Sequence, residues 1–394
     1  MIATIGFVFA IWLLVYMIIR GIDMITATVV TAAVILVTSG LNVWDGFLTT
    51  YSGGIGSFVT SWFLILGLGG VFGQLVLEAG LATRIAKTLT EKLGAKMVGA
   101  VILICSFFIT LLGINGYIMV FVLYPIADNL LKQNRMDRRV LPFLILGGGA
   151  CANGFAFSLD VCNVLPSNYL NTSLGSSPML SFFFTAIAAV SYFIYFDYAQ
   201  KQSRKKHSVE ELLAMYPEKN KEAEEMELPG FGISVLPFVV VLGAVVATSG
   251  WGTSTSILFS LALGILLIVL TQFKRIKNVK ASIKSGSTSG LNSMLTAVMG
   301  LSRVLGASPV FQNLQTVVLN LNMPMYLKAF FGTTVLTGLT GSAISGETIF
   351  MESFGQAFVD MGVNVQALHR IVTEAALVLN KLPNSSVALL TMSL

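Results

Sequence analysis

Charged residues are scarce in this sequence, and their scarcity excludes several classes of protein. Asp, Glu, Lys and Arg make up 11% of the 394 residues, and segment 201–227 alone holds 13 of the 43, whereas soluble proteins contain about 25%. So few charges cannot cover the surface of a soluble globule, and they exclude a disordered chain and a nucleic-acid-binding protein. With hydrophobic residues at 55%, the composition predicts an all-α polytopic membrane protein, whose partner is the lipid bilayer and not a nucleic acid.

Motifs for metal, nucleotide and covalent chemistry are missing as well. Cys105, Cys151 and Cys162 have no paired spacing, which argues against a disulfide framework or a metal site. The chain contains no HExxH and no GxxxxGK[ST] motif, and no GxSxG in a strand–turn–helix context. We therefore expect no metal, no cofactor and no enzyme activity, and an ion gradient rather than ATP as the source of energy.

Apolar runs separated by basic clusters set the predicted topology. A membrane-spanning helix needs about 20 mostly apolar residues. Lys and Arg cluster at 84–96, 132–139, 201–221 and 274–284, whereas 41–53, 170–177, 250–253 and 307–323 contain none. The first group is placed in the cytoplasm and the second outside, which predicts a multi-pass protein of a bacterial cytoplasmic (inner) membrane. The candidate spans are 1–19, 22–40, 55–77, 97–113, 115–131, 140–158, 176–197, 231–249, 254–273, 286–306, 325–340, 343–361 and 366–390.

Two features of the first half do not fit simple spans. Segment 97–131 has basic residues at both ends, so both ends lie inside, and its arms of about 17 residues are near the lower limit for a span. We predict a re-entrant helical hairpin with its tip at 113–116, and two full spans remain the alternative. Segment 140–170 then crosses once and is expected to break at 158–168, where Pro166 removes a backbone donor.

The second half repeats this plan in inverted orientation. Asn163-Val164-Leu165-Pro166-Ser167-Asn168 recurs as Asn380-Lys381-Leu382-Pro383-Asn384-Ser385. We predict a first inverted repeat over 1–198 (hairpin 97–131, broken helix 140–170), a charged cytoplasmic linker over 199–230, and a second repeat over 231–394 (hairpin 325–361, broken helix 366–390). No counterpart of span 176–197 follows, so the second repeat is expected to lack its last helix. Paired broken elements in inverted repeats indicate a secondary transporter with its binding site at the midplane.

The broken elements supply the candidate site residues. Helix N-termini at the breaks favour anions, and helix C-termini favour cations. Ionisable residues at membrane depth are candidates for ion coupling: Asp160, Glu347 and Lys381, although an ion pair between Asp160 and Lys381 is the alternative. Glu352 and Glu374 are weaker candidates, and Arg303 is expected near the outer interface. The candidate substrate-binding residues, for which hydrogen bonds between helices are the alternative role, are Asn115, Gly116, Asn163, Ser167, Asn168, Ser342, Ser345, Asn380, Asn384 and Ser385.

These residues resemble the gluconate:proton symporter (GntP) family of bacterial permeases over most of the chain. The resemblance is clearest at Leu68–Gly73 with Glu78–Ala82, at Asn163–Leu170, at Leu339–Gly346, and at Gly362–Asn364 with Ala367–Arg370. It implies two re-entrant hairpins, a homodimer, and transport of a small organic anion with a proton. In the family, the second break reads like D-T-L-P-H-N-G, whereas here it is Asn380-Lys381-Leu382-Pro383-Asn384-Ser385-Ser386, so neither the substrate nor the coupling ion carries over.

The sequence therefore predicts a secondary active transporter of a small organic anion, such as gluconate or a related sugar acid or hydroxy acid. A proton is the expected coupling ion, with sodium as the alternative. A passive facilitator or channel, or a non-transporting degenerate membrane protein, are the alternative functions.

Overall fold

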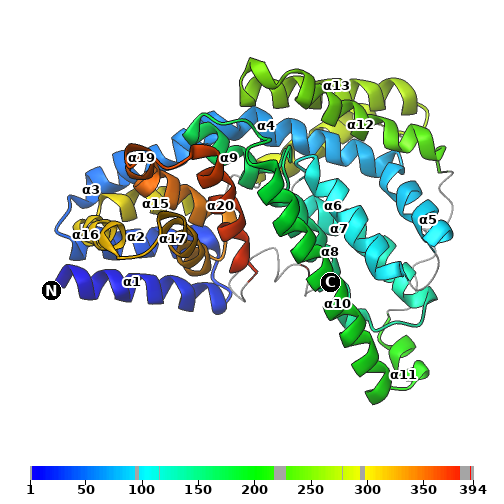
Figure 1. Cartoon of the computed structure of the whole chain (residues 1–394), viewed down its shortest axis with the longest axis horizontal. Helices are drawn as coiled ribbons and strands as arrows, with labels where there is room; N and C mark the ends of the chain where they lie inside the picture. The colour runs from blue at the N-terminus through cyan, green and yellow to red at the C-terminus, as the bar shows by residue number, and fades with distance from the viewer. Residues whose placement is uncertain are drawn as a thin grey trace. The chain divides into compact units, whose positions relative to one another are not determined.

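The computed structural model describes residues 2–93, 97–114, 116–216, 228–276, 278–292, 298–381 and 391, and the described part of the chain is helical without any strand (Figure 1). Four helical stretches are long and apolar enough to cross a membrane: Ile2–Ile19, Val43–Glu78, Pro178–Lys206 and Thr253–Gln272. The predicted all-α polytopic membrane protein is thus confirmed.

The chain divides into two compact units that are each discontinuous in sequence. Unit 1 comprises Met1–Leu64, Val161–Ser177 and Leu291–Leu394, and unit 2 comprises Ile65–Asp160 and Pro178–Gly290. The predicted inverted repeats concern orientation in the membrane and stay a prediction. Unit 1 contains α1 (Ile2–Ile19), α2 (Met24–Thr38), α3 (Val43–Asp45), the π-helix η1 (Gly46–Tyr51), the first part of α4 (Ser52–Glu78), α9 (Val161–Leu170), α15 (Val298–Ala307), α16 (Pro309–Asn320), α17 (Met325–Thr340), α18 (Ala343–Phe350), the π-helix η7 (Met351–Gly355), α19 (Gln356–Asp360) and α20 (Val365–Val378).

Unit 2 is built around a helical hairpin at the predicted place. Its helices are the remainder of α4, α5 (Leu81–Leu93), α6 (Val98–Leu111), α7 (Gly116–Gln133), the short 3₁₀ helix η3 (Arg138–Val140), α8 (Leu141–Asn153), α10 (Pro178–Lys206), α11 (Val209–Ala214), α12 (Phe231–Ala247), the 3₁₀ helix η5 (Ser249–Trp251), α13 (Thr253–Gln272) and α14 (Val279–Asn292). The hairpin α6–α7 packs on α8, where Ser106 Oγ donates to Ile145 O at 2.5 Å.

The irregular backbone of the first break holds the tip of this hairpin. Leu159 N donates to Leu111 O at 2.8 Å. Gly113 has a φ of +73°, and a Cβ at this position would lie 2.7 Å from Leu159 O. Only glycine tolerates both the left-handed conformation and so close a carbonyl. The tip of the first hairpin is therefore fixed by a backbone contact that no side chain could replace.

The first break lies earlier in the chain than the sequence indicated. Residues 154–160 are irregular, and α9 then continues through Pro166 to Leu170. A proline in a helix removes the bond to the carbonyl four residues earlier, here that of Cys162. Thr373 Oγ1 of α20 donates to that carbonyl at 3.3 Å. The expected break at 158–168 is thus wrong over most of its length, because a hydroxyl from another helix replaces the missing donor.

In unit 1, a second helical hairpin is formed by α17 and α18, and η7 and α19 continue its second arm. Ser342 caps the N-terminus of α18, its Oγ accepting from Ser345 N at 3.4 Å. A Cβ at Gly346 would lie 2.4 Å from the backbone N and Cα of Thr337, so Gly346 packs directly against α17 and leaves no room for a side chain of its own. The helix α20 packs against α17, α18 and α9.

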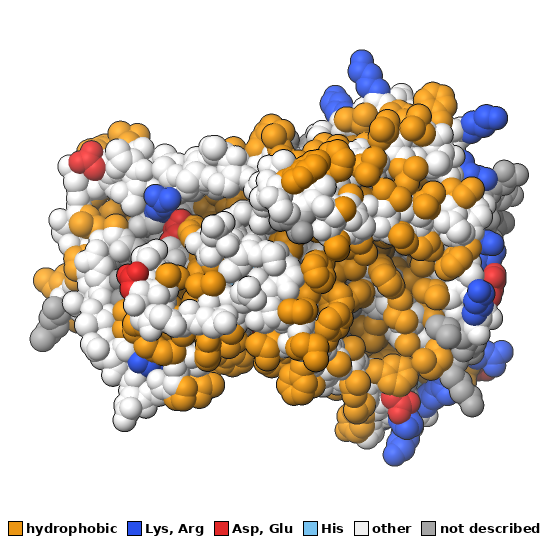
Figure 2. All heavy atoms as spheres, turned by 45° about the horizontal axis from the view of Figure 1, so that its top comes forward, with side chains coloured by type: hydrophobic (Ala, Val, Ile, Leu, Met, Phe, Trp, Pro, Cys, Tyr) orange, Lys and Arg blue, Asp and Glu red, His pale blue; other side chains and the backbone are white. Residues whose placement is uncertain are grey.

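The outer surface of the helices is apolar. Trp12, Phe183 and Leu270 are 57%, 59% and 70% exposed. Figure 2 shows hydrophobic side chains over much of the visible face, with most Lys and Arg side chains gathered at its edge. Such exposed apolar area would cause a soluble protein to aggregate but matches a hydrocarbon surrounding.

Candidate functional site

The N-termini of two short helices meet in unit 1. Cys162, the second residue of α9, and Ala343, the first residue of α18, form a buried cluster with Ala376 of α20. The first backbone N–H groups of a helix lack helical partners, and they carry partial positive charge. Two positive helix ends therefore converge beside α20, and such ends attract anions.

A buried hydrogen-bond network connects α9 to α20 at this point. Asn163 is fully buried, and its Oδ1 lies 3.1 Å from His369 Nε2 while its Nδ2 donates to Leu174 O at 3.2 Å. The hydroxyl of Thr172 lies 2.7 Å from His369 Nδ1. Both ring nitrogens of His369 thus have partners: Nε2–H can donate to Asn163 Oδ1, and the Thr172 hydroxyl can donate to Nδ1 of a neutral imidazole. The predicted residue Asn163 accordingly orients His369.

Next to His369 lies a fully buried guanidinium. Arg370 is 0% exposed, and its Nη2 donates to Ser176 O at 3.1 Å and to Leu174 O at 3.4 Å. Glu347 of α18, also 0% exposed, and Glu374, one turn further along α20, both act on it electrostatically. An Arg with two carboxylates inside a membrane-embedded unit is costly and typical of a functional position.

A polar cavity of about 290 Å³ lies in unit 1 between four elements. It is lined by Ser57 and Ser61 of α4, Asn168 and Tyr169 of α9, Arg303 of α15, and Thr348 and Glu352 of the second hairpin. A further hollow of about 390 Å³ shares Tyr169, Arg303 and Glu352 with it. Its polar side chains suit a hydrophilic solute of a few carbon atoms.

Arg303 is the cation of this cavity, and its present contacts are loose. Its Nε lies 3.4 Å from Glu352 Oε1, and its Nη2 lies 3.4 Å from Ser57 Oγ. Tyr169 donates its hydroxyl to the same Glu352 oxygen at 3.0 Å. With 47% of its side chain exposed, the guanidinium is accessible to an anion. The sequence predicted only that Arg303 lies near the outer interface, and the ion pair with Glu352 is an additional finding of the structure.

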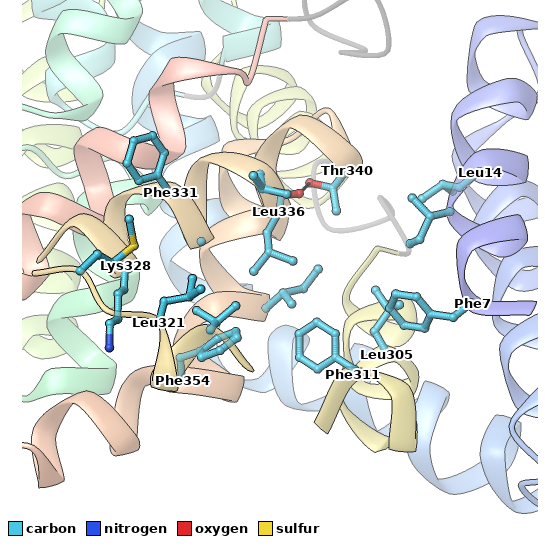
Figure 3. Close-up of a pocket in the computed structure, with 16 residues that line it drawn as sticks. Phe7, Leu14, Leu305, Phe311, Leu321, Lys328, Phe331, Leu336, Thr340 and Phe354 are labelled. Carbon is cyan, nitrogen blue, oxygen red and sulfur yellow. Dashed lines mark hydrogen bonds between the residues drawn. The ribbon is translucent and has the colours of Figure 1, made fainter. Parts of the chain in front are cut away.

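A second cavity in unit 1, of about 360 Å³, has a different character (Figure 3). Phe7, Phe311, Phe331 and Phe354 line it, and the amine of Lys328 points away from the other labelled side chains and donates to Leu319 O. So apolar a lining offers a hydroxy acid no hydrogen bonds, and we exclude this cavity as its binding site.

The other predicted site residues lie in several places. Asn115, Asn384 and Ser385 are outside the described residues, and Gly116 begins α7 in unit 2. Ser167 donates to Thr172 O, and Ser342 and Ser345 form the start of α18, so these serines have structural partners. Asn380 is buried, and its Oδ1 accepts no hydrogen bond from the described residues. Asp160 directly precedes α9, and the dipole of that helix favours a negative charge at this position. Lys381 is half-buried.

The sequence did not single out Arg370 or Tyr169 as site residues, and it offered Glu374 as a weaker candidate, which the structure places near Arg370. One signal was available: Arg370 and Glu374 stand four residues apart in an apolar segment, the spacing of neighbours on one helix face. Among the described residues, no group of three or more His, Cys, Asp or Glu side chains is arranged to hold a metal ion.

Comparison with known proteins matches the sequence to one family. The family model described as GntP family permease covers residues 2–368. An uncharacterized transporter YxjC of Bacillus subtilis (strain 168) is 23% identical over 95% of this chain and 89% of its own. Two proteins of Haemophilus influenzae (strain ATCC 51907 / DSM 11121 / KW20 / Rd) are also similar: an uncharacterized permease, 24% identical over 61% of this chain and 49% of its own, and an uncharacterized transporter, 21% identical over 85% and 77%.

Proposed function

The chain belongs to the GntP family of permeases, and from this premise we propose that it is a proton symporter for a small organic anion, such as gluconate or a related sugar acid or hydroxy acid. It is a multi-pass protein of the cytoplasmic membrane and a transporter. We further propose that it works as a homodimer.

The observation that carries the choice of an anion is the positive character of the polar site in unit 1. Arg303 supplies a half-exposed guanidinium to this cavity, which Asn168 of α9 and Thr348 of α18 also line. The N-termini of these two helices meet at another place in unit 1, beside Ala376 of α20. A guanidinium binds a carboxylate through paired N–H donors. The hydroxyl and amide groups of Ser57, Ser61 and Asn168 would bind the hydroxyls of a sugar acid.

In this proposal the carboxylate of the solute replaces Glu352 as the partner of Arg303. Because the Arg303–Glu352 contact is long, at 3.4 Å, breaking it requires little free energy. In this proposal other residues of the breaks and tips, Asn163, Ser342, Ser345 and Asn380 among them, hold the helix ends in place and do not contact the solute in the cavity itself. Asp160, Glu347 and Lys381 remain the proposed coupling residues, with a proton as the ion and sodium as the alternative.

The first test is binding. A thermal-shift screen of sugar acids, hydroxy acids and amino acids across pH, on the purified protein, should identify a stabilising anion, since a ligand at about 100 times its Kd stabilises by about 2.7 kcal/mol. Counterflow in proteoliposomes then separates a carrier, which shows trans-stimulation, from a channel, which does not. A chain that neither binds nor moves any such acid would contradict the proposed function.

The second test addresses Arg303. Arg303→Gln should weaken binding of the stabilising anion about tenfold or more, because a charge-assisted pair contributes about 1.5–3 kcal/mol. Lys284→Gln, which removes an exposed cation from α14 of unit 2, is the matched control and should leave the affinity unchanged. Equal affinities of wild type and Arg303→Gln would place the solute elsewhere.

A further inference from the structure

The charges around Arg370 do not balance. One guanidinium faces two carboxylates: Glu347 of α18, which is fully buried, and Glu374, which shares its helix face one turn away. The guanidinium is held in place by the carbonyls of Leu174 and Ser176. Two ionised carboxylates would leave one net negative charge in a buried site, which is strongly unfavourable.

The neighbouring groups do not supply a second positive charge. His369 is fully buried beside Arg370, and both burial and a neighbouring positive charge disfavour the imidazolium form. From α9 the ionisable groups are the buried thiol of Cys162 and the phenol of Tyr169, and neither can carry a positive charge. The face of α17 presents hydroxyls, and its Lys328 donates instead to Leu319 O. On α15, Arg303 pairs with Glu352, and Lys381 follows the end of α20 two turns beyond Glu374.

Several polar atoms at this place lack partners among the described residues. Oε1 of Glu374 is buried and accepts no hydrogen bond from them. The Thr337 hydroxyl is 0% exposed, lies against Gly346, the residue before Glu347, and also has no described partner, as does the Thr333 hydroxyl one turn earlier. Other helical threonines here, such as Thr340 and Thr348, donate to the carbonyl four residues back. Buried unpaired oxygens indicate a missing hydrogen atom or ligand.

We propose that Glu347 and Glu374, arranged around the single guanidinium of Arg370, form the site that takes up the coupling proton. The inference rests on the proposed function and identifies residues for it. One carboxylate pairs with Arg370, and the other binds a proton, forming one O–H bond and no other, so that the site is neutral. Releasing that proton to water restores the net negative charge. Glu374, which the sequence ranked low, thereby joins Glu347 as a coupling residue.

Replacing either carboxylate alone should remove the bound proton from the site. In Glu374→Gln or Glu347→Gln, the carboxylate that remains pairs with Arg370, and the site no longer needs a proton. Infrared difference spectra of the ligand-free protein in nanodiscs across pH detect protonated carboxyl groups directly. We expect either variant to lose the carboxylic-acid band that the wild type shows at neutral pH. Asp360→Asn, at the exposed end of α19, should keep it.

Transport provides the second readout. In proteoliposomes, Glu374→Gln should keep counterflow exchange, while its pH-gradient-driven accumulation falls about tenfold or more. Two results would overturn the proposal: a carboxylic-acid band that survives in both variants, or Glu374→Gln accumulating substrate like the wild type. Accumulation driven by a sodium gradient alone would also overturn it. If the wild type transports no organic acid, the proposed function fails, whereas the infrared measurement still decides whether this site binds a proton.

Discussion

At the scale of single residues, Pro166 lies inside α9 because Thr373 of α20 serves the carbonyl that the proline leaves without its helical donor. Thr373→Val removes this donor from a buried carbonyl, and also the bond to His369 O at 3.0 Å. We expect a loss of stability of about 1–2 kcal/mol, measured as a lower apparent unfolding temperature in detergent.

The coupling between Thr373 and Pro166 can be tested in the same assay. Pro166→Ala in the Thr373→Val background restores a backbone N–H for Cys162 O and should recover much of the loss. Thr60→Val, which removes an exposed hydroxyl bonded to Gly56 O, controls for the chemical change and should have little effect. A loss that is the same with and without Pro166 would show that the hydroxyl acts elsewhere.

The contribution of Asp137 to the stability of the fold can be measured through its dependence on pH. It lies in the loop before η3 and binds Arg139 at 2.7 Å, and its backbone N donates to Gln200 of α10 at 3.0 Å. Burial raises its pKa, but hydrogen bonds from Arg139 and Ser203 outweigh burial and lower the pKa to about 2, from 3.8. A lowered pKa stabilises the fold at pH values above 3.8, and this contribution disappears as the pH falls towards 2.

Asp137→Asn should therefore lower the stability at neutral pH by about 1 kcal/mol, a value reduced by the solvent exposure of Arg139. The difference from wild type should shrink as the pH falls from 4 to about 2, which pH-dependent unfolding in urea measures. Asp45→Asn, at the end of α3, is the control. A difference independent of pH would show that the carboxylate charge is not the cause.

At the scale of elements, the second hairpin depends on direct contact between its arms. In Gly346→Ala the new methyl group would lie 2.4 Å from the backbone N and Cα of Thr337, atoms that cannot move without displacing α17. We expect a destabilisation of about 1–3 kcal/mol and a loss of transport larger than the loss of folded protein. Gly56→Ala in α4, where nothing lies within 4 Å, should be neutral or slightly stabilising.

Hairpin positions could be predicted from the sequence, and the break could not. The apolar runs 97–113 and 115–131 correspond closely to α6 and α7, and 325–340 to α17, because hydrophobic run length and glycines act locally. The position of the break could not be predicted because α9 continues past Pro166 with the help of Thr373, which lies more than 200 residues from Cys162. The cluster at Arg370 likewise requires the chain after α9 to place its carbonyls against α20. Such tertiary bonds leave no periodic trace in the sequence.

At the scale of the whole molecule, contacts within each unit join segments that the charge pattern assigns to one side of the membrane. Ser39 lies 3.3 Å from Ser308, both beside segments expected outside, whereas Ser282 binds Glu78 at 2.5 Å, both beside segments expected inside. The arm α6 has 14 residues and measures about 21 Å, less than the hydrocarbon thickness of about 30 Å. The contacts agree with the predicted sidedness, and the short arm favours a re-entrant first hairpin over two full spans.

Single cysteines at the four ends of the two hairpins test this topology. In a background in which the buried Cys105, Cys151 and Cys162 are replaced, Met97→Cys and Gln133→Cys should react with a membrane-impermeant thiol reagent from the cytoplasmic side. Asn322→Cys and Asp360→Cys should react from the outside. The members of each pair flank one hairpin, and a re-entrant hairpin returns its chain to the side from which it started.

If only one arm of a hairpin crossed the membrane, the two members of its pair would lie on opposite sides. Labelling of Met97→Cys and Gln133→Cys from opposite sides would therefore contradict re-entrance of the first hairpin. Same-side labelling of all four cysteines would instead contradict the inversion, because the two hairpins then start from the same face. The expected result, each pair together and the two pairs on opposite sides, requires that both hairpins return to their starting side and that the second is inverted relative to the first. With arms too short to cross, such hairpins would bring their tips into the membrane from opposite faces, the arrangement that a site open alternately to either side needs.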